Sequence, residues 1–190
     1  IETVEMDLFK KELFSNLKKQ LDKKVSLIKK TFFETSDGSL NVGLNSILID
    51  SLLRIIFKKT YYKIFNDSDY IFSIIAVGGY GRGELAPYSD LDLLFLLPNN
   101  LEKNQNKKTE EVIQFILYIL WDLGYTVGHS TRTISDCIKK SKLDLTISTT
   151  LLEKRFIIGN EEVFNLLNNK FNFFIKISKT LKFVEAKLVE

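Results

Sequence analysis

The sequence predicts an α+β protein in which short apolar strands combine with amphipathic helices, preceded by an N-terminal helical region. Apolar side chains recur at helical spacing, uninterrupted by glycine or proline, over residues 3–33 and again over Leu44–Phe65. Two short apolar runs, Ile71–Val77 and Leu93–Leu97, then flank a glycine-rich turn and have the length of buried strands. The second run is apolar at every position, so we expect it at the centre of a covered sheet.

The elements after the glycine turn are predicted from spacing and from residues that break helices. Asparagine and lysine dominate residues 98–108, which we expect to form an exposed loop. Before this loop we expect a strand over Asp90–Leu97. After it we expect, in order, a helix over Glu110–Leu123 capped by Thr109, a strand over Tyr125–Thr131, a helix through Lys140 capped by Thr133 or Ser135, a helix over Leu143–Arg155, a break at Gly159-Asn160, and a short helix over Glu161–Asn169.

This order divides the chain into three parts. We assign residues 1–68 to the N-terminal helical region, residues 69–170 to a central domain that contains the glycine turn, and residues 171–190 to a helix leading to a missing C-terminal region. The chain starts at Ile1 rather than at methionine and ends at Glu190 within a helix-like pattern. We therefore expect a fragment of a longer protein.

Composition limits the classes of partner and compartment. Apolar residues make up 45% of the 190, which suffices for a core and argues against long disorder. The net charge of +3 is mild and lysines alternate with acids, so we expect no nucleic-acid partner. No apolar run reaches the roughly 18 residues of a membrane span, so we expect no membrane insertion. The single cysteine, Cys137, excludes an internal disulfide, which fits the cytoplasm, and its spacing predicts a core position.

The glycine turn and the acids that follow it carry the chemical signal. Four of the nine glycines lie between Gly78 and Gly83, where backbone N–H groups can approach a ligand without a Cβ in the way. Asp90 and Asp92 open the second strand, and residues two apart on a strand share a face at about 7 Å between Cα atoms. A glycine turn beside paired carboxylates suits a polyphosphate held through Mg²⁺. The pattern predicts a nucleotidyltransferase active site.

Two other glycine-loop motifs do not fit. The Walker phosphate loop ends in Gly-Lys-Ser/Thr, whereas Gly83 is followed by Glu84. The segment Gly81-Arg82-Gly83-Glu84-Leu85-Ala86 superficially matches the dinucleotide fingerprint, which requires a helix to begin there. Pro87 and a strand follow instead.

The predicted roles follow from the residue types. Asp90 and Asp92 are the expected metal ligands; the alternative is a pair of turn or capping carboxylates, but two such acids repel each other unless a cation lies between them. The backbone of Gly78 and Gly79 and the hydroxyl of Ser89 are expected to donate hydrogen bonds to the triphosphate. Arg82 either neutralises phosphate charge or forms a local salt bridge with Glu84.

The segment 77–97 closely resembles the N-terminal nucleotidyltransferase domain of the bifunctional PII uridylyltransferase/uridylyl-removing enzymes. The resemblance covers roughly residues 71–190 and includes the stretches Leu120-Trp121-Asp122-Leu123-Gly124, Val127-Gly128-His129-Ser130-Thr131-Arg132-Thr133, Asp144 through Arg155, and Phe183-Val184-Glu185-Ala186-Lys187-Leu188. It implies a polymerase-β-like nucleotidyltransferase fold, a mixed sheet flanked by helices. It also implies Mg²⁺-dependent transfer of UMP from UTP to a tyrosine hydroxyl of the nitrogen-signalling protein PII.

The resemblance also bears on regions and residues beyond the aspartate pair. Full-length members carry an HD-type hydrolase domain and two ACT domains, and His129, the only histidine here, cannot supply an HD metal site. The fold usually has a third carboxylate, for which Asp144 is our candidate; the alternative is an ordinary helix N-cap. Ser130 and Arg132 share a strand face, so they either reach the triphosphate or base or are sheet-edge polar residues.

Two rival functions remain at this point. The glycine turn and aspartate pair do not select a base, so a transferase that uses another nucleotide, such as ATP, is one alternative. A catalytically inactive, nucleotidyltransferase-like regulatory or binding module is the other.

Overall fold

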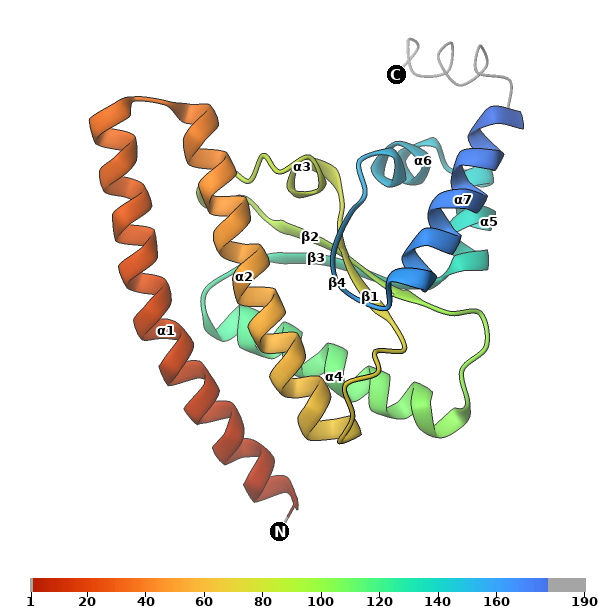
Figure 1. The fold of residues 1–190 in the computed structure, drawn as a ribbon, viewed down its shortest axis with the longest axis horizontal. Coiled ribbons are helices and arrows are strands. Elements are labelled where there is room, and N and C mark those ends of the chain that lie inside the picture. The colour runs from red at the N-terminus through yellow and green to blue at the C-terminus, as the bar shows by residue number, and fades with distance from the viewer. Residues whose placement is uncertain (1, 178–190) are drawn as a thin grey trace.

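A computed structural model describes residues 2–177 of the chain. This part of the chain contains seven helices and four strands (Figure 1). They are α1 (Glu2–Thr35), α2 (Gly38–Phe65), β1 (Ser73–Ala76), α3 (Gly78–Gly81), β2 (Leu91–Leu97), α4 (Lys103–Asp122), β3 (Val127–Thr133), α5 (Ile134–Leu143), α6 (Leu145–Leu152), β4 (Arg155–Gly159) and α7 (Glu161–Ile177).

The four strands form one mixed sheet in the order β3-β2-β1-β4. The strand β2 pairs antiparallel with β1 and parallel with β3, and β1 pairs antiparallel with β4. The prediction that β2 occupies a central position is confirmed, and all of its residues except Asp92 are buried. The expected α+β class with a mixed sheet and an N-terminal helical region is likewise confirmed.

Helices cover both faces of the sheet. Successive side chains of β2 point to opposite faces and contribute to the hydrophobic core on each side. Leu93 and Phe95 belong to a large hydrophobic cluster with α1, α2 and α4. Leu94 and Leu96 point the other way, into a smaller cluster with α5, α6 and α7. Figure 1 shows these two helical layers on either side of the strands. Cys137 lies buried in the smaller cluster, as predicted.

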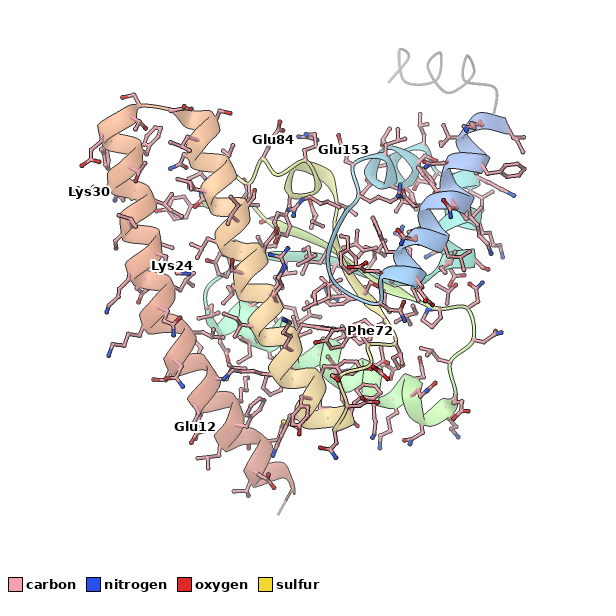
Figure 2. All side chains as sticks on the ribbon, viewed as in Figure 1. Glu12, Lys24, Lys30, Phe72, Glu84 and Glu153 are labelled. Carbon is pink, nitrogen blue, oxygen red and sulfur yellow. The ribbon has the colours of Figure 1, made fainter. Side chains whose placement is uncertain are left out.

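The N-terminal helices α1 and α2 form a hairpin that packs on the sheet. The side chain of Asp37 caps α2 by accepting a hydrogen bond from the Leu40 N–H, and Asn66 ends the helix in a left-handed conformation. The outer face of α1 is charged, with Glu12, Lys24 and Lys30 exposed (Figure 2). Because its inner face shares one hydrophobic cluster with β1 and β2, the predicted boundary near residue 68 does not separate two cores.

By length and composition, α2 is the one described helix that could cross a membrane. Half of its most apolar window is buried within this fold, as in the core helix of a water-soluble protein. Its buried side includes Asp50 as well as apolar side chains such as Phe57. We therefore describe it as a core helix.

The start of α4 was predicted wrongly. The loop expected over residues 98–108 is shorter, because the helix begins at Lys103. Glu102 caps it and forms a capping box with Gln105, a pairing in which each side chain accepts a hydrogen bond from the other's backbone. Thr109, the expected cap, is buried inside the helix.

The region after α5 also differs from expectation. Thr133 caps α5, as one of the two predicted candidates. The helix predicted over Leu143–Arg155 ends at Leu152, and residues 155–159 form the unpredicted strand β4, because β1 supplies their hydrogen-bond partners. The last described helix, α7, crosses the predicted boundary at residue 171. The expected helix beyond residue 177 lies outside the described residues.

Candidate active site

The glycine turn connects β1 to the segment that leads into β2, and its backbone forms one helical turn, α3. Gly78 has φ +60°, a left-handed conformation that favours glycine. The Gly81 N–H donates to the Val77 carbonyl (3.0 Å), and the Arg82 N–H donates to the Gly78 carbonyl (3.1 Å). The first N–H groups of such a turn have no carbonyl partner within it, so those of Gly78 and Gly79 can bind an anion.

The carboxylate of Asp92 lies between this turn and β3. Asp92 is the second residue of β2, and its carbonyl accepts a hydrogen bond from the Val77 N–H (3.1 Å). Gly128 is its register partner on β3. A Cβ on Gly78 would lie 3.3 Å from one carboxylate oxygen, and a Cβ on Gly128 would lie 2.6 Å from the other. Glycine at both positions therefore leaves room for the Asp92 side chain.

Asp90 and Asp92 are exposed and interact electrostatically. Partial burial raises the pKa of Asp92, and the negative charge of Asp90 raises it further. Such repulsion makes a cation favourable at this point. Within residues 2–177, no group of three or more His, Cys, Asp or Glu side chains could hold a metal ion. The pair still fits Mg²⁺, which commonly takes one or two carboxylates together with phosphate oxygens and waters.

Asp144, the predicted third carboxylate, caps a helix. Its side chain accepts hydrogen bonds from the Thr146 N–H (2.8 Å) and the Ile147 N–H (3.4 Å) at the start of α6. In the described part of the chain, no third acid joins the Asp90–Asp92 pair in a potential metal-binding group. The geometry supports the N-cap alternative and does not support a catalytic role for Asp144.

Arg82 forms the local salt bridges that were the alternative to phosphate binding. Its guanidinium contacts Glu84 at 2.8 Å and Glu153 at 2.6 Å, and these two acids raise its pKa. Figure 2 shows Glu84 and Glu153 near α3 and α6, respectively. All three side chains remain at least one-third exposed, so the pairs join two loops at modest energetic gain. Ser89 is exposed, and its N–H donates to the Ala86 carbonyl.

Ser130 and Arg132 lie on the same side of the sheet as Asp92. In the parallel register, Asp92 is opposite Gly128, Leu94 is opposite Ser130, and Leu96 is opposite Arg132. Along β3, Ser130 lies about 7 Å beyond Gly128, the register partner of Asp92, and Arg132 lies about 13 Å beyond it. The Nε of Arg132 is buried and has no hydrogen-bond partner among the described residues.

His129 points to the opposite side of β3 from these residues. Its ring lies 6.4 Å from the ring of Phe95 and 6.4 Å from that of Trp121. His129 therefore packs among aromatic side chains on the face of the sheet away from Asp92.

Gly128 is the site residue that the sequence analysis missed. A glycine inside a strand commonly marks the close approach of another group, which would have been the available signal. The sequence pattern favours the neighbouring polar residues instead, because their side chains can bind a ligand directly.

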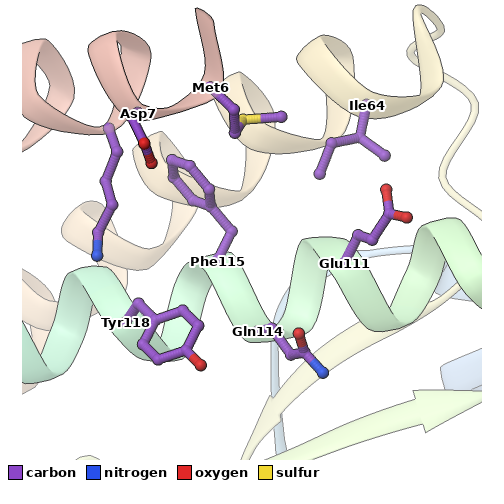
Figure 3. A pocket seen from close by; sticks show the side chains of 8 residues that line it. Met6, Asp7, Ile64, Glu111, Gln114, Phe115 and Tyr118 are labelled. Carbon is purple, nitrogen blue, oxygen red and sulfur yellow. The ribbon is translucent and has the colours of Figure 1, made fainter. Parts of the chain in front are cut away.

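Two cavities lie elsewhere in the fold. One, of about 360 Å³, lies between α1, α2 and α4 (Figure 3) and mixes apolar with charged side chains. Its lining residues are Met6, Asp7, Lys10, Ile64, Glu111, Gln114, Phe115 and Tyr118. The other, of about 540 Å³, is lined by α5 and α7. Neither is lined by the glycine turn or the aspartate pair, so neither is the candidate nucleotide site.

Known bacterial proteins are similar in sequence to this chain. The chain is 39% identical over 188 residues to a bifunctional uridylyltransferase/uridylyl-removing enzyme of Azospirillum brasilense, covering 97% of this chain and 20% of that protein. It is 48% identical over 117 residues to the enzyme of the same name from Caulobacter vibrioides, covering 62% of this chain and 12% of the relative. The chain thus spans a fifth or less of the length of these relatives.

A solved structure described as the "Crystal structure of the toxin-antitoxin with AMP-PNP" aligns with 70% of this chain and 98% of that one. The TM-score is 0.40 and the identity is 13%, too low a similarity to support an argument.

The nucleotidyltransferase domain family matches residues 58–157. This range contains the glycine turn, both aspartates, strands β1, β2 and β3, and the first three residues of β4. The match, together with the relatives named uridylyltransferases, shows an enzyme domain that transfers nucleotides. The chain belongs to the nucleotidyltransferase domain family.

Proposed function

We propose that this domain transfers UMP from UTP to a tyrosine hydroxyl of a PII signalling protein, with Mg²⁺ as cofactor and release of pyrophosphate. The observation that carries the proposal is the position of the Asp92 carboxylate, between the glycine turn and β3 and beside Asp90. In this arrangement, the N–H groups that would bind the triphosphate and the acids that would bind Mg²⁺ lie at the same end of β2. The relatives named uridylyltransferases support UTP as the donor.

The chain's own groups would bind and orient the triphosphate. The N–H groups of Gly78 and Gly79 would donate to its oxygens, and the exposed hydroxyl of Ser89 would add a further donor. Ser130, on the same side of the sheet as Asp92, would lie toward the sugar or base. Arg82 would reach the phosphates only by leaving Glu84 and Glu153.

The reaction would be an in-line displacement at the α-phosphorus. The tyrosine oxygen of the acceptor forms a new P–O bond as the bond to the bridging oxygen of pyrophosphate breaks, and the hydroxyl proton leaves to solvent. Mg²⁺ held by Asp90 and Asp92 would neutralise charge on the triphosphate and lower the pKa of the attacking hydroxyl. Because the aspartates lie at the exposed end of β2, an acceptor side chain can approach them from solvent.

We further propose a cytoplasmic location and no nucleic-acid or membrane partner. The single cysteine is buried and free, as suits a reducing compartment. The mild net charge of +3 gives little support for nucleic-acid binding.

The test is transfer of label from [α-³²P]UTP to purified PII in the presence of Mg²⁺. We expect labelled PII with the 190-residue chain and with Asp22→Asn, and no label with Asp92→Asn. Asp22 is the matched control, because it is an exposed acid on α1 that pairs only at the surface with Lys18. Equal labelling by both variants would refute the assigned role of Asp92.

A thermal-shift series distinguishes the rival functions. A ligand that binds only the folded state raises Tm, so Mg²⁺ with UTP should stabilise the protein more than Mg²⁺ with ATP. Stabilisation by ATP alone would point to another nucleotide. Binding of UTP without transfer to PII would point to a different acceptor or to a need for regions outside this chain, and no binding of either nucleotide would favour an inactive module.

A further inference from the structure

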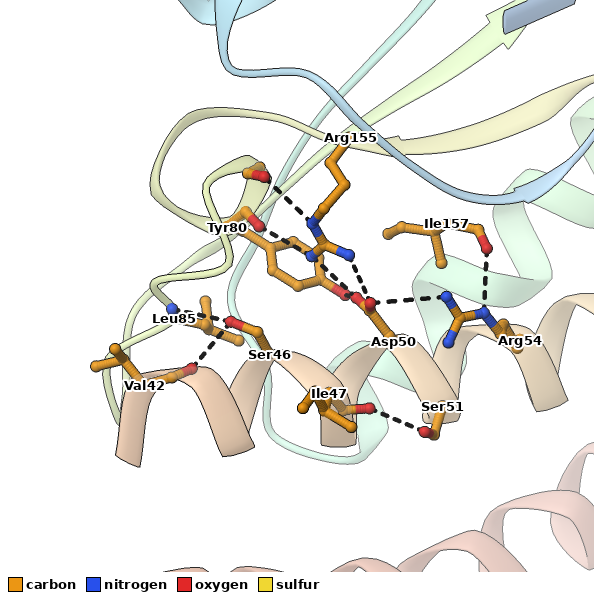
Figure 4. A network of polar contacts seen from close by, with 11 residues as sticks. Val42, Ser46, Ile47, Asp50, Ser51, Arg54, Tyr80, Leu85, Arg155 and Ile157 are labelled. Carbon is orange, nitrogen blue, oxygen red and sulfur yellow. Dashed lines mark hydrogen bonds and ion pairs between the residues drawn. The ribbon is translucent and has the colours of Figure 1, made fainter. Parts of the chain in front are cut away.

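We propose that Asp50, Tyr80 and Arg155 form a positioning unit through which helix α2 fixes the glycine turn in its nucleotide-binding shape (Figure 4). The inference rests on the proposed function, since it assigns the turn to the triphosphate. None of the three side chains reaches the triphosphate in our assignment, so their effect is exerted through the backbone of the turn.

Asp50 brings the unit to the sheet from α2. It lies in the middle of the helix, and its side chain is 9% exposed. One carboxylate oxygen accepts a hydrogen bond from the Tyr80 hydroxyl at 2.7 Å. Tyr80 belongs to α3 but points away from the anion-binding side of the turn into the interior, where it is 2% exposed. The turn is thereby joined to a helix about 30 residues earlier in the chain.

Arg155, the first residue of β4, joins the carboxylate to the turn itself. Its guanidinium binds Asp50 through two nitrogens, at 2.5 and 3.1 Å. The same guanidinium donates to the carbonyl of Tyr80 at 3.0 Å and to the carbonyl of Gly81 at 3.2 Å. Two successive peptide groups of the turn are therefore held in one orientation by one planar cation.

A second contact from α2 holds the end of the turn. The Ser46 hydroxyl accepts a hydrogen bond from the Leu85 N–H at 3.1 Å and donates to the Val42 carbonyl at 2.9 Å. Ser46 and Asp50 are one helical turn apart, so the same face of α2 contacts Tyr80 in the middle of the glycine segment and Leu85 just after it (Figure 4). The glycine segment is thus held at two points by one helix.

The polar character of the unit is better explained by positioning than by stability. Desolvation of a buried ion pair largely offsets the attraction between its charges, so such a pair adds little to the free energy of unfolding compared with apolar packing. A glycine-rich turn, in contrast, has wide conformational freedom when nothing restrains it. Hydrogen bonds to the Tyr80 and Gly81 carbonyls fix the peptide planes whose N–H groups close the turn onto Val77 and Gly78. They therefore hold the shape of the turn from which the N–H groups of Gly78 and Gly79 would face the phosphates.

The test compares two conservative variants, Tyr80→Phe and Tyr61→Phe, in the 190-residue chain. Both delete the hydroxyl of a buried tyrosine, but that of Tyr61 bonds only to the carbonyl of Asp69 and the N–H of Ile71. The readouts are Tm, amide hydrogen exchange over residues 78–85, and the Kd of the Mg²⁺–UTP complex. A purely structural role would move only Tm.

We expect comparable falls in Tm for the two variants. Tyr80→Phe alone should speed exchange over residues 78–85 and weaken Mg²⁺–UTP binding roughly tenfold, the equivalent of about one hydrogen bond. Asp50→Asn keeps an acceptor for the Tyr80 hydroxyl but loses the charge opposite Arg155 and Arg54, and it should give the same pattern.

Equal exchange and equal Kd in Tyr80→Phe and Tyr61→Phe would overturn the positioning role. If the unchanged chain binds no Mg²⁺–UTP, the proposed function fails, while the exchange comparison still decides whether the unit restrains the turn. The two proposals are therefore tested separately.

Discussion

The substitution Gly128→Ala tests the candidate site with little effect on the fold. The new Cβ would lie 2.6 Å from the nearer carboxylate oxygen of Asp92, whereas ordinary contact begins at 3.4 Å, so that oxygen must move by about 0.8 Å. The carboxylate is the flexible end of a side chain, so it can shift toward Gly78, where the absence of a Cβ leaves room. Gly128 is not among the glycines with positive φ, so alanine suits its backbone and should stabilise the strand by roughly 0.5–1 kcal/mol.

We therefore expect a variant with unchanged or higher Tm and impaired UMP transfer. A displacement approaching 1 Å in a catalytic group can lower the rate by roughly 10²-fold, and this is the expected loss in kcat/KM. The assay is labelling of PII over a range of Mg²⁺ and UTP concentrations, with Tm measured on the same preparation. Gly43→Ala is the matched control, because no atom lies within 4 Å of its added Cβ.

Two outcomes would refute this reasoning. Transfer at the rate of the unchanged chain, with the same Mg²⁺ dependence, would mean that the position of the Asp92 carboxylate is not critical. A fall in Tm of several degrees would mean that backbone, rather than the carboxylate, absorbs the clash.

Four further substitutions test other parts of the structure. Gly81→Ala would place a Cβ 1.9 Å from the backbone oxygen of Glu153, which cannot rotate away, so urea denaturation should show a loss of at least about 1–3 kcal/mol. Asp144→Ala should cost about 1 kcal/mol through loss of the N-cap, whereas Asp144→Ser keeps a capping oxygen and should retain both stability and transfer; loss of transfer in the serine variant would restore the third-carboxylate hypothesis. Burial raises the pKa of Tyr61 from 10.0 to about 12, so above pH 10 the unfolded state loses a proton that the folded state keeps, and stability should fall as pH rises from 10 to 12. Tyr61→Phe should show a shallower fall across that interval, and an equal slope would contradict the assignment.

The central strands could be predicted because their sequence and burial agree. Strand β2 is apolar on both faces, and this pattern indicates a covered strand wherever it occurs. Strand β4 could not be recognised, since Arg155–Gly159 is only five residues long and its hydrogen bonds come from β1, about 80 residues earlier in the chain. The start of α4 was missed for a local reason. Glu102 is an uncommon cap, and the polar residues that follow it resemble a loop.

The candidate site was predicted where residue type alone carries the chemistry. Aspartates two residues apart after a glycine turn are typical of a site that binds a metal ion and a phosphate. In the structure, the side chain of Asp92 lies beside that turn. Gly128 and Asp50 could not be found in this way, because their importance lies in what they approach. One leaves space across a parallel strand pair, and the other contacts the turn from a distant helix.

The way α2 packs on the sheet affects how this protein can be divided or recombined. The family match begins at residue 58, inside α2, so a chain cut there would lose Ser46 and Asp50 together with the apolar side chains that cover the sheet. At roughly 1.5–3 kcal/mol for each buried leucine, isoleucine or phenylalanine, the missing helix outweighs the stability of a typical domain. The segment that resembles other nucleotidyltransferases is thus smaller than the unit that can fold. A chimera that exchanges the N-terminal helices between relatives would have to carry matching partners for Tyr80 and Arg155, or the glycine turn would lose its support even if the hydrophobic core survived.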